Sequence, residues 1–145
     1  MLKIGIMLAV VLTLGISTQV YAANNMTGKV TSVLDGDTLK IKVGDNTKKI
    51  RFVSIDAPEM DSGRTTATDA KQFVINECLG KQAIVDVNDP RTKDSSGRTL
   101  GLVYCNGNTI DMNQLELEQD YAVLYRQYAC DKVHNEFWNN TWIQC

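Results

Sequence analysis

Four carboxylates and one arginine fall at the two ends of a predicted β-hairpin, and their types suggest chemistry. These residues are Asp35, Asp37, Arg51, Asp56 and Glu59. Apolar strands give acids little structural reason to gather at their ends, whereas a hard cation such as Ca²⁺ takes oxygen ligands and tolerates irregular geometry. The arrangement therefore predicts a cation site, with Asp37 and Asp56 as the expected ligands. Alone, Asp35-Gly36-Asp37 is also ordinary turn chemistry.

The segment Asp56-Ala57-Pro58-Glu59 follows the second strand of that hairpin. Pro58 has no amide hydrogen to extend the strand, and its ring fixes the chain direction on either side. Glu59 is therefore a candidate general base, because a positioned carboxylate can take a proton from a water molecule near a metal. The alternative is a solvated acidic loop.

Two arginines are predicted to bind phosphate. Arg98 ends the stretch Asp94-Ser95-Ser96-Gly97-Arg98, a tight glycine turn before a strand, and Arg51 lies within an apolar strand where its charge needs a specific partner. The planar guanidinium donates two hydrogen bonds to phosphate oxygens and stays charged at any relevant pH. A solvated surface arginine is the simpler alternative for Arg98.

Hydrophobic periodicity supplies the elements that must position these residues. It predicts strands over residues 28–34, 38–43, 49–55, 82–87 and 99–105, and helices over residues 66–79 and 111–118. Residues 23–27 are predicted to be a loose lead. Gly80 is expected to end the first helix and Asp111 to cap the second. Aromatic residues from Tyr121 onward are predicted to cover one end of the core.

This order of elements fits a mainly β fold with helices. Three strands, a helix, two more strands and short C-terminal helices indicate a five-stranded Greek-key barrel of the OB type, with one helix between strands 3 and 4. The 145 residues, 43% apolar and 22% charged, suit a single domain over residues 23–145 with a short C-terminal tail.

The first 22 residues are predicted to be a secretory signal peptide. Lys3 gives a positive start, residues 4–16 are almost continuously apolar, and Val20-Tyr21-Ala22 is typical of a cleavage site. The apolar run is shorter than the about 20 residues that a membrane span needs, although an uncleaved anchor is the alternative. We expect cleavage after Ala22 and a secreted or periplasmic protein that is a monomer without membrane attachment.

The charge balance shows no polybasic footprint. The chain has net charge −2, and removal of residues 1–22 takes away Lys3 and no acid, which makes the expected mature charge −3. Phosphate binding is therefore expected from a few placed arginines and a bound cation rather than from overall charge.

The four cysteines Cys78, Cys105, Cys130 and Cys145 all lie in the predicted mature chain. An even number behind an export signal favours two disulfides over a metal cluster. The single histidine, His134, and the absence of any Cys-x-x-Cys spacing argue against zinc. Of the three possible pairings we favour Cys78–Cys105, which joins a helix end to a strand end, and Cys130–Cys145, which closes the tail.

The order and spacing of these motifs resemble the staphylococcal nuclease (thermonuclease) family from about residue 29 to residue 128. The resemblance rests on Asp35-Gly36-Asp37-Thr38, on Arg51 eight residues before Glu59, and on Asp94-x-x-Gly97-Arg98 before the last strand. It implies an OB-fold enzyme that hydrolyses DNA and RNA with Ca²⁺ and leaves 3′-phosphate products. It further implies that Asp37, Asp56 and the Ala57 carbonyl bind Ca²⁺, that Glu59 is the general base, and that Arg51 and Arg98 bind the phosphate.

Several positions depart from the family pattern. Ser96 replaces a tyrosine in the turn before Arg98, and Asp120 stands where a glycine usually ends the helix. The loop after Glu59 is short, and the usual long C-terminal helix is reduced to a tail, for which Cys130–Cys145 is the expected substitute. Two other classes remain open: a catalytically inactive OB module that binds nucleic acid or protein, and a Ca²⁺-stabilised structural domain. Neither explains the complete set of candidate residues.

Overall fold

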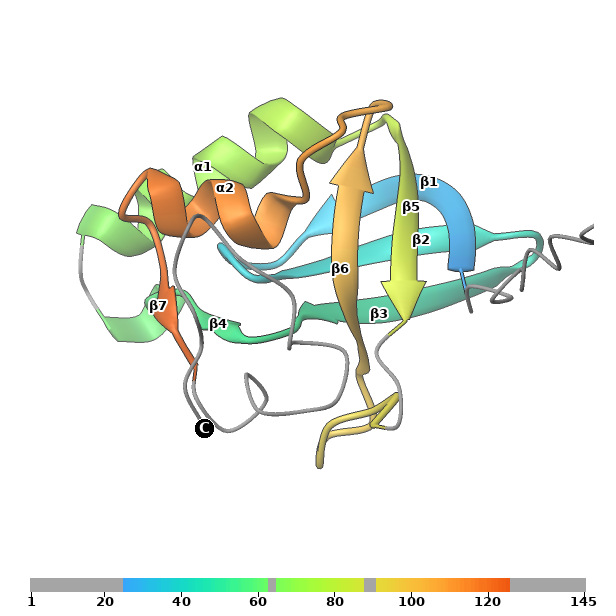
Figure 1. Cartoon of the computed structure of the whole chain (residues 1–145), viewed down its shortest axis with the longest axis horizontal. Helices are drawn as coiled ribbons and strands as arrows, with labels where there is room; N and C mark the ends of the chain where they lie inside the picture. Colours follow the sequence, from blue (N-terminus) through green and yellow to red (C-terminus); the bar gives the residue numbers. More distant parts are fainter. Residues whose placement is uncertain (1–24, 63–64, 88–90, 126–145) are drawn as a thin grey trace, which may run out of the picture.

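A computed structural model describes residues 25–62, 65–87 and 91–125 of the chain (Figure 1). The predicted signal peptide, the predicted Cys130–Cys145 disulfide and most of the aromatic tail lie outside these residues. Within the described ranges, no helix is both long and apolar enough to cross a membrane.

Five strands close into a barrel, which confirms the predicted fold class. They are β1 (Asn25–Val33), β2 (Thr38–Val43), β3 (Asn46–Phe52), β5 (Gln82–Val87) and β6 (Thr99–Cys105). The order around the barrel is β1-β2-β3-β6-β5, and β5 pairs back onto β1. Only the β3–β6 pair is parallel among these neighbours; the other four pairs are antiparallel. A short, closed, mostly antiparallel barrel of this kind is the OB architecture.

Alternation along the hairpin sets which side chains fill the barrel. Leu39 on β2 lies opposite Ile50 on β3, and both are fully buried in the core. Successive side chains of a strand point to opposite faces, so Arg51, one residue after Ile50, faces outward. The register therefore places a charged side chain on the outer face of the barrel wall, where other segments bury it. The largest fully buried apolar side chains are those of Val30, Leu39, Ile41, Ile50, Phe52, Val53, Ile55, Val74, Val85, Leu100 and Met112.

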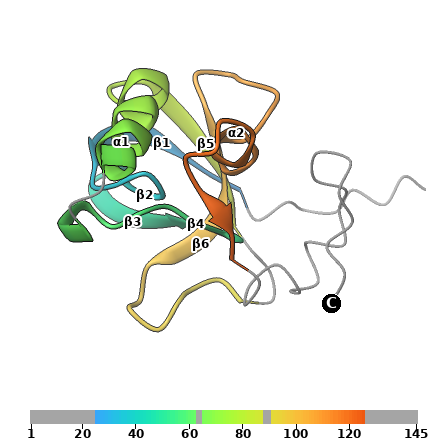
Figure 2. The same cartoon turned by 90° about the vertical axis from the view of Figure 1, so that its left-hand side faces the viewer.

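Two helices lie on the same side of the barrel (Figures 1 and 2). The first is α1 (Thr65–Cys78), preceded by a 3-10 turn over Met60–Ser62, and the second is α2 (Met112–Glu118). Asp111 caps α2 as predicted, because its carboxylate accepts a hydrogen bond from the Gln114 amide at 2.8 Å. Gly80 follows α1 with φ +78°, which is a conformation that glycine adopts readily at a helix end.

The third strand was predicted to run to Ile55, and this prediction is wrong. β3 ends at Phe52, and the chain then turns at Val53 and Ser54, where Ser54 has φ 65°. A separate short strand, β4 (Ile55–Asp56), pairs with β7 (Val123–Leu124) outside the barrel. The apolar run at residues 52–55 looks continuous in sequence, but the turn carries Asp56 away from the barrel wall and toward the C-terminal part of the chain.

The predicted loose lead at residues 23–27 is also wrong over its described part. Asn25, Met26 and Thr27 belong to β1 and pair with Asp86, Val85 and Ile84 of β5. The burial of this segment alternates along the strand, but the segment is short, and its pairing with β5 establishes its strand state.

Asn113 ties α2 to the chain segments next to the site. Its side chain is fully buried; the Oδ1 atom accepts from the Val103 amide at 3.1 Å, and Nδ2 donates to the carbonyl of Val53 at 2.8 Å and that of Gly101 at 3.2 Å. One side chain thus satisfies three backbone groups of β6 and of the turn that leads to β4. This role could not be predicted from the sequence, because a single asparagine in a helix forms no recognisable pattern.

The predicted disulfide between Cys78 and Cys105 is present, with Cα atoms 5.2 Å apart and both cysteines buried. It joins the end of α1 to the end of β6 across a sequence separation of 27. The pairing of Cys130 with Cys145 stays a prediction.

Replacing this disulfide in the double variant Cys78→Ala/Cys105→Ala is expected to lower the free energy of unfolding by about 3 kcal/mol, because the cross-link restricts the unfolded chain. Urea unfolding followed by circular dichroism measures this loss. Reduction of the unaltered protein should lower the midpoint by at least as much, because it would also break the predicted Cys130–Cys145 disulfide. An unchanged midpoint in the double variant would contradict the prediction.

Candidate active site

Asp37 is a buried carboxylate at the start of the β2–β3 hairpin. Its Oδ1 atom accepts from the Thr38 hydroxyl at 2.9 Å, and its Oδ2 atom accepts from the Ala57 amide at 2.7 Å. Burial raises the pKa of Asp37 to about 7, although the neighbouring Arg51 guanidinium acts in the opposite direction. An acid in this setting is poorly compensated, and a further positive charge would stabilise its ionised form.

Arg51 bridges the two predicted ligand carboxylates. Its Nη2 atom lies 3.2 Å from Asp37 Oδ2 and 2.9 Å from Asp56 Oδ1, while its Nη1 atom donates to the carbonyls of Phe52 at 2.7 Å and Ile55 at 2.8 Å. The two carbonyls fix the guanidinium in place. The prediction that this strand arginine needs a specific partner is therefore confirmed.

The Asp-Gly-Asp turn has two roles. Asp35 is a turn former, as expected, because its Oδ1 atom accepts from the Asp37 amide at 3.0 Å. Gly36 is needed for close packing: a Cβ atom there would lie 2.6 Å from the Ala70 Cβ and 2.8 Å from the Ala57 Cβ. The turn thus brings α1 and the Asp56–Glu59 segment against Asp37.

Arg98 lies on the same outward face, held by its own loop. Asp94 accepts from the Arg98 amide at 2.9 Å and also from the Arg98 Nε, and it accepts from the Ser96 amide at 3.0 Å. Gly97 has φ +76°, as the predicted tight turn requires. Arg98 Nη1 lies 3.5 Å from the Thr38 hydroxyl, which places the arginine beside the strand position next to Asp37.

One open pocket of about 280 Å³ brings most of the predicted site residues together. It is lined by Arg51, Asp56, Glu59, Asp94, Ser95, Arg98 and Tyr125. Glu59 is exposed and Asp56 is half exposed, whereas Arg51 is almost buried. Arg98 does fold back beside Arg51 although 47 positions separate them in sequence. Asp37 and Ala57 do not line this pocket; they adjoin it through Arg51 and Asp56.

Comparison with known proteins supplies the family. Residues 49–140 match the family described as staphylococcal nuclease homologue, which is more than half of the chain. The chain belongs to the staphylococcal nuclease homologue family. The matched range contains Arg51, Asp56, Glu59 and Arg98, and it begins after Asp37.

Individual relatives agree with this assignment. A protein named "Uncharacterized endonuclease" from Escherichia coli O157:H7 is 36% identical over 108 residues, which cover 73% of this chain and 65% of that protein. A protein named "Micrococcal nuclease" from Shigella flexneri is 33% identical over 109 residues, covering 70% of this chain and 60% of that protein. The chain therefore spans less than two thirds of the length of these relatives.

Three residues that line this pocket, Asp94, Ser95 and Tyr125, were not predicted as site residues from the sequence. Asp94 orients Arg98: partial burial alone would raise the pKa of Asp94, but hydrogen bonds from Arg98 outweigh this and lower it. The sequence signal that could have identified Asp94 was its position four residues before Arg98 in a glycine-containing turn. Tyr125 was assigned to the covering aromatic tail, yet it lines the pocket, because its backbone amide is held by the Ser54 carbonyl at 2.8 Å.

The departures from the family pattern have local explanations. Asp120 has φ 59°, so it adopts the left-handed conformation for which the family uses glycine. Tyr121 behind it packs against Phe73 of α1 with ring centroids 5.2 Å apart, as predicted for the aromatic tail. Ser96 contributes its backbone amide to Asp94 and does not line the pocket.

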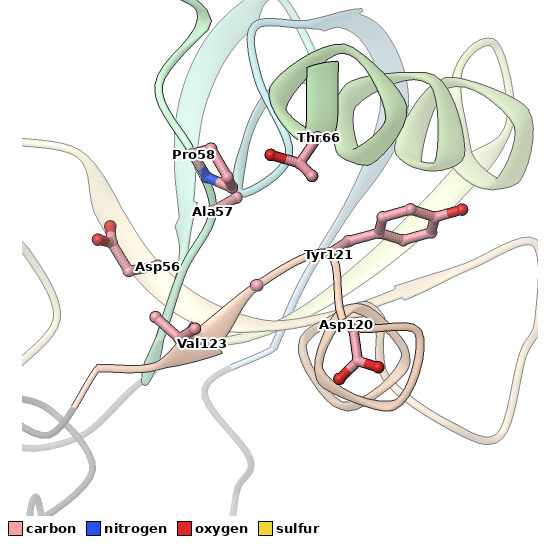
Figure 3. A pocket seen from close by; sticks show the side chains of 8 residues that line it. Asp56, Ala57, Pro58, Thr66, Asp120, Tyr121 and Val123 are labelled. Carbon is pink, nitrogen blue, oxygen red and sulfur yellow. The ribbon is translucent and has the colours of Figure 1, made fainter. Parts of the chain in front are cut away.

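A second hollow of about 180 Å³ lies beside the Asp56–Pro58 segment, toward α2 (Figure 3). Asp56 and Ala57 line it together with Thr66, Tyr121 and Val123 among others. Figure 3 shows the Asp56 carboxylate on the opposite side of the view from the Tyr121 ring. Neither Arg51 nor Arg98, the two arginines predicted to bind phosphate, lines this hollow; both line the other pocket.

Two carboxylates at the site offer oxygen atoms, which are the ligands that a hard cation takes. Asp37 Oδ2 and Asp56 Oδ1 contact the same arginine nitrogen at 3.2 and 2.9 Å, so these oxygens are no more than about 6 Å apart. Within the described ranges no group of three or more acidic, histidine or cysteine side chains is gathered for a metal. A cation here would need backbone oxygen and water beside the two carboxylates, which Ca²⁺ accepts.

Proposed function

We propose that this protein is a Ca²⁺-dependent nuclease that hydrolyses phosphodiester bonds of DNA and RNA and leaves 3′-phosphate products. The observation that carries the proposal is the pocket in which Arg51 and Arg98 meet Glu59 and Asp56. The family membership and the two nuclease-named relatives support the same class of reaction. An inactive binding module would not need a base beside two arginines and paired carboxylates.

The cation would be held by Asp37, Asp56 and the Ala57 carbonyl. When bound, Ca²⁺ acts as a Lewis acid toward a phosphate oxygen and lowers the pKa of a bound water. The turn residues hold the Asp37 carboxylate in position, since Thr38 and Ala57 both donate to it.

The side chains divide the remaining work. Glu59 takes a proton from the attacking water, whose oxygen forms a new bond to phosphorus, while the bond to the 5′ oxygen breaks. The leaving 5′ oxygen takes up a proton from solvent to become a hydroxyl, and Glu59 returns its proton to solvent. Arg98 donates to the phosphate oxygens on which negative charge develops, and Arg51 adds its positive charge beside them, although its Nη atoms are already held by two carbonyls and two carboxylates. Arg98 suits this role because Asp94 holds its Nε, and no described residue bonds its Nη2.

Export is part of the proposal. The N-terminal sequence has the layout of a signal peptide, and the Cys78–Cys105 disulfide suits an oxidising compartment. Mass spectrometry of the protein secreted by an expressing bacterium would identify the N-terminal residue. A retained Met1 would argue against cleavage after Ala22.

A gel assay tests the activity. The purified protein is incubated with single-stranded DNA, duplex DNA or RNA in Ca²⁺ or in EGTA. We expect cleavage in Ca²⁺, none in EGTA, and fragments whose 3′ ends become extendable by polymerase only after phosphatase treatment. Cleavage that persists in EGTA would remove the metal from the mechanism, and absence of cleavage at all Ca²⁺ concentrations would favour the inactive binding module.

A further inference from the structure

Lysines follow the outward face of the β2–β3 hairpin toward the candidate active site. Lys40 lies directly opposite Lys49, and Lys42 is one outward position nearer to the hairpin turn. Arg51 is the next outward position after Lys49 and lines the pocket. At about 3.4 Å per residue, successive outward positions are about 7 Å apart. The row begins at the hairpin turn, far from β4 and β7 (Figure 1), and ends at the pocket.

A groove on the other edge of β3 continues this positive surface. It has a volume of about 390 Å³ and is lined by Lys48, Lys49 and Lys93, with no carboxylate among its lining residues. The loop that borders the groove through Lys93 and Gly97 also carries Arg98 into the pocket. Groove and pocket therefore share both β3 and this loop.

The packing gives these lysines no structural purpose. Like charges directly opposite on neighbouring strands are destabilising, and Lys40 faces Lys49 while Lys42 also faces Lys29 on β1. Among the residues that the structure describes, none of these lysines forms an ion pair. Lys40, Lys42 and Lys49 therefore place like charges on one face of the β2–β3 hairpin, in a chain whose net charge is −2.

We propose that Lys40, Lys42, Lys48, Lys49 and Lys93, here called the lysine track, bind the phosphates of a single-stranded nucleic acid that enters the pocket. The proposal rests on the proposed nuclease function for the position of the scissile phosphate, which lies between Arg51 and Arg98. The net charge predicts phosphate binding only by placed arginines and a cation. The strand register adds a row of lysines that the net charge conceals.

Counterion release makes the track measurable. Each phosphate neutralised on a single strand contributes about −0.7 to the slope of log affinity against log salt concentration. A strand long enough to reach the hairpin uses the track, whereas a dinucleotide occupies only the pocket. The track should therefore change binding of long strands without changing cleavage of the shortest substrate.

The experiment compares Lys42→Gln/Lys49→Gln with the control Lys71→Gln/Lys81→Gln on and just after α1, which removes the same charge elsewhere. Fluorescence anisotropy of a labelled single strand of about 20 nucleotides is measured in EGTA between about 50 and 200 mM salt. If each of the two replaced lysines binds one phosphate, the slope of log affinity against log salt concentration becomes shallower by about 1.4 in the track variant. Over this salt range, the drop in affinity of the track variant is then about seven-fold smaller than the drop for the unaltered protein. The control variant should keep the original slope.

Three results would overturn the track: no binding by the unaltered protein at low salt, equal slopes in both double variants, or a lower melting temperature in the track variant. A lower melting temperature would count against the track because removing facing like charges should leave stability unchanged or raise it.

Cleavage in Ca²⁺ is measured separately. The track variant should raise KM for the long strand and leave kcat/KM for a dinucleotide unchanged. If the unaltered protein cleaves neither substrate while the anisotropy difference persists, the nuclease proposal fails and the track stands.

Discussion

Glu59→Gln is expected to lower kcat by about 10²–10⁴-fold, which is the usual contribution of a general base. Glutamine keeps the shape and polarity of the side chain but cannot accept the proton of the attacking water. Because Glu59 is exposed and is not among the residues expected to bind the cation or the phosphate, KM and the Ca²⁺ concentration for half-maximal activity should change little. Initial rates on single-stranded DNA over a range of substrate and Ca²⁺ concentrations measure all three quantities.

Two variants make this result specific. Glu77→Gln on α1 removes an acid far from the pocket and should retain the original kcat. Asp56→Asn should also reduce activity, but by weakening cation binding, so part of its loss should be recovered at high Ca²⁺, unlike the loss in Glu59→Gln. A kcat within tenfold of the original in Glu59→Gln would assign the base to another group.

Glu116→Leu is expected to stabilise the protein by about 3 kcal/mol at pH 7, a large effect for one substitution. The Glu116 side chain is fully buried on α2, and among the described residues neither carboxylate oxygen has a hydrogen-bond partner. Burial, with a smaller contribution from the charge of Asp37, raises its pKa from the ordinary value of 4.5 to about 9. Leucine fills a similar volume without an ionisable group.

The pH dependence follows from the direction of this shift. Between pH 4.5 and about 9 the unfolded chain loses the Glu116 proton while the folded protein keeps it, so stability falls as pH rises. One pKa unit corresponds to 1.36 kcal/mol. The destabilisation of the folded protein by Glu116 is therefore about 3 kcal/mol at pH 7 and about 6 kcal/mol near pH 9. Below pH 4.5 both states hold the proton, and this contribution disappears.

Urea unfolding at pH 5, 7 and 9 tests this expectation. The stability difference between Glu116→Leu and the unaltered protein should grow with pH. Glu118→Gln is the matched control, since it removes an exposed acid two residues away on the same helix and should give no such growth. Equal stability of Glu116→Leu and the unaltered protein at pH 9 would show that interactions in the folded protein stabilise the ionised Glu116 carboxylate.

The sequence alone determined the elements whose signals are local. Strands 38–43, 82–87 and 99–105 match β2, β5 and β6, because alternation or β-rich composition bounded by turn residues is visible within a few positions. Helices were placed to within a residue by periodicity, by Gly80 and by the Asp111 cap. The site residues came from motif order, since Asp37, Arg51, Asp56, Glu59 and Arg98 stand at characteristic spacings. The Cys78–Cys105 pairing followed from the predicted element ends.

Only the tertiary structure decided how distant segments meet. The turn at Val53 and Ser54 exists because β4 finds its partner β7 about 70 positions later, and no local pattern announces that pairing. Likewise, the Ala57 amide holds Asp37 across 20 positions, and Arg51 joins Asp37 to Asp56. Packing also determines that Glu116 is buried, and strand register determines that Lys40 lies opposite Lys49. Charge and periodicity specify which side chains are available, but long-range hydrogen bonds and strand register determine which of them share a site.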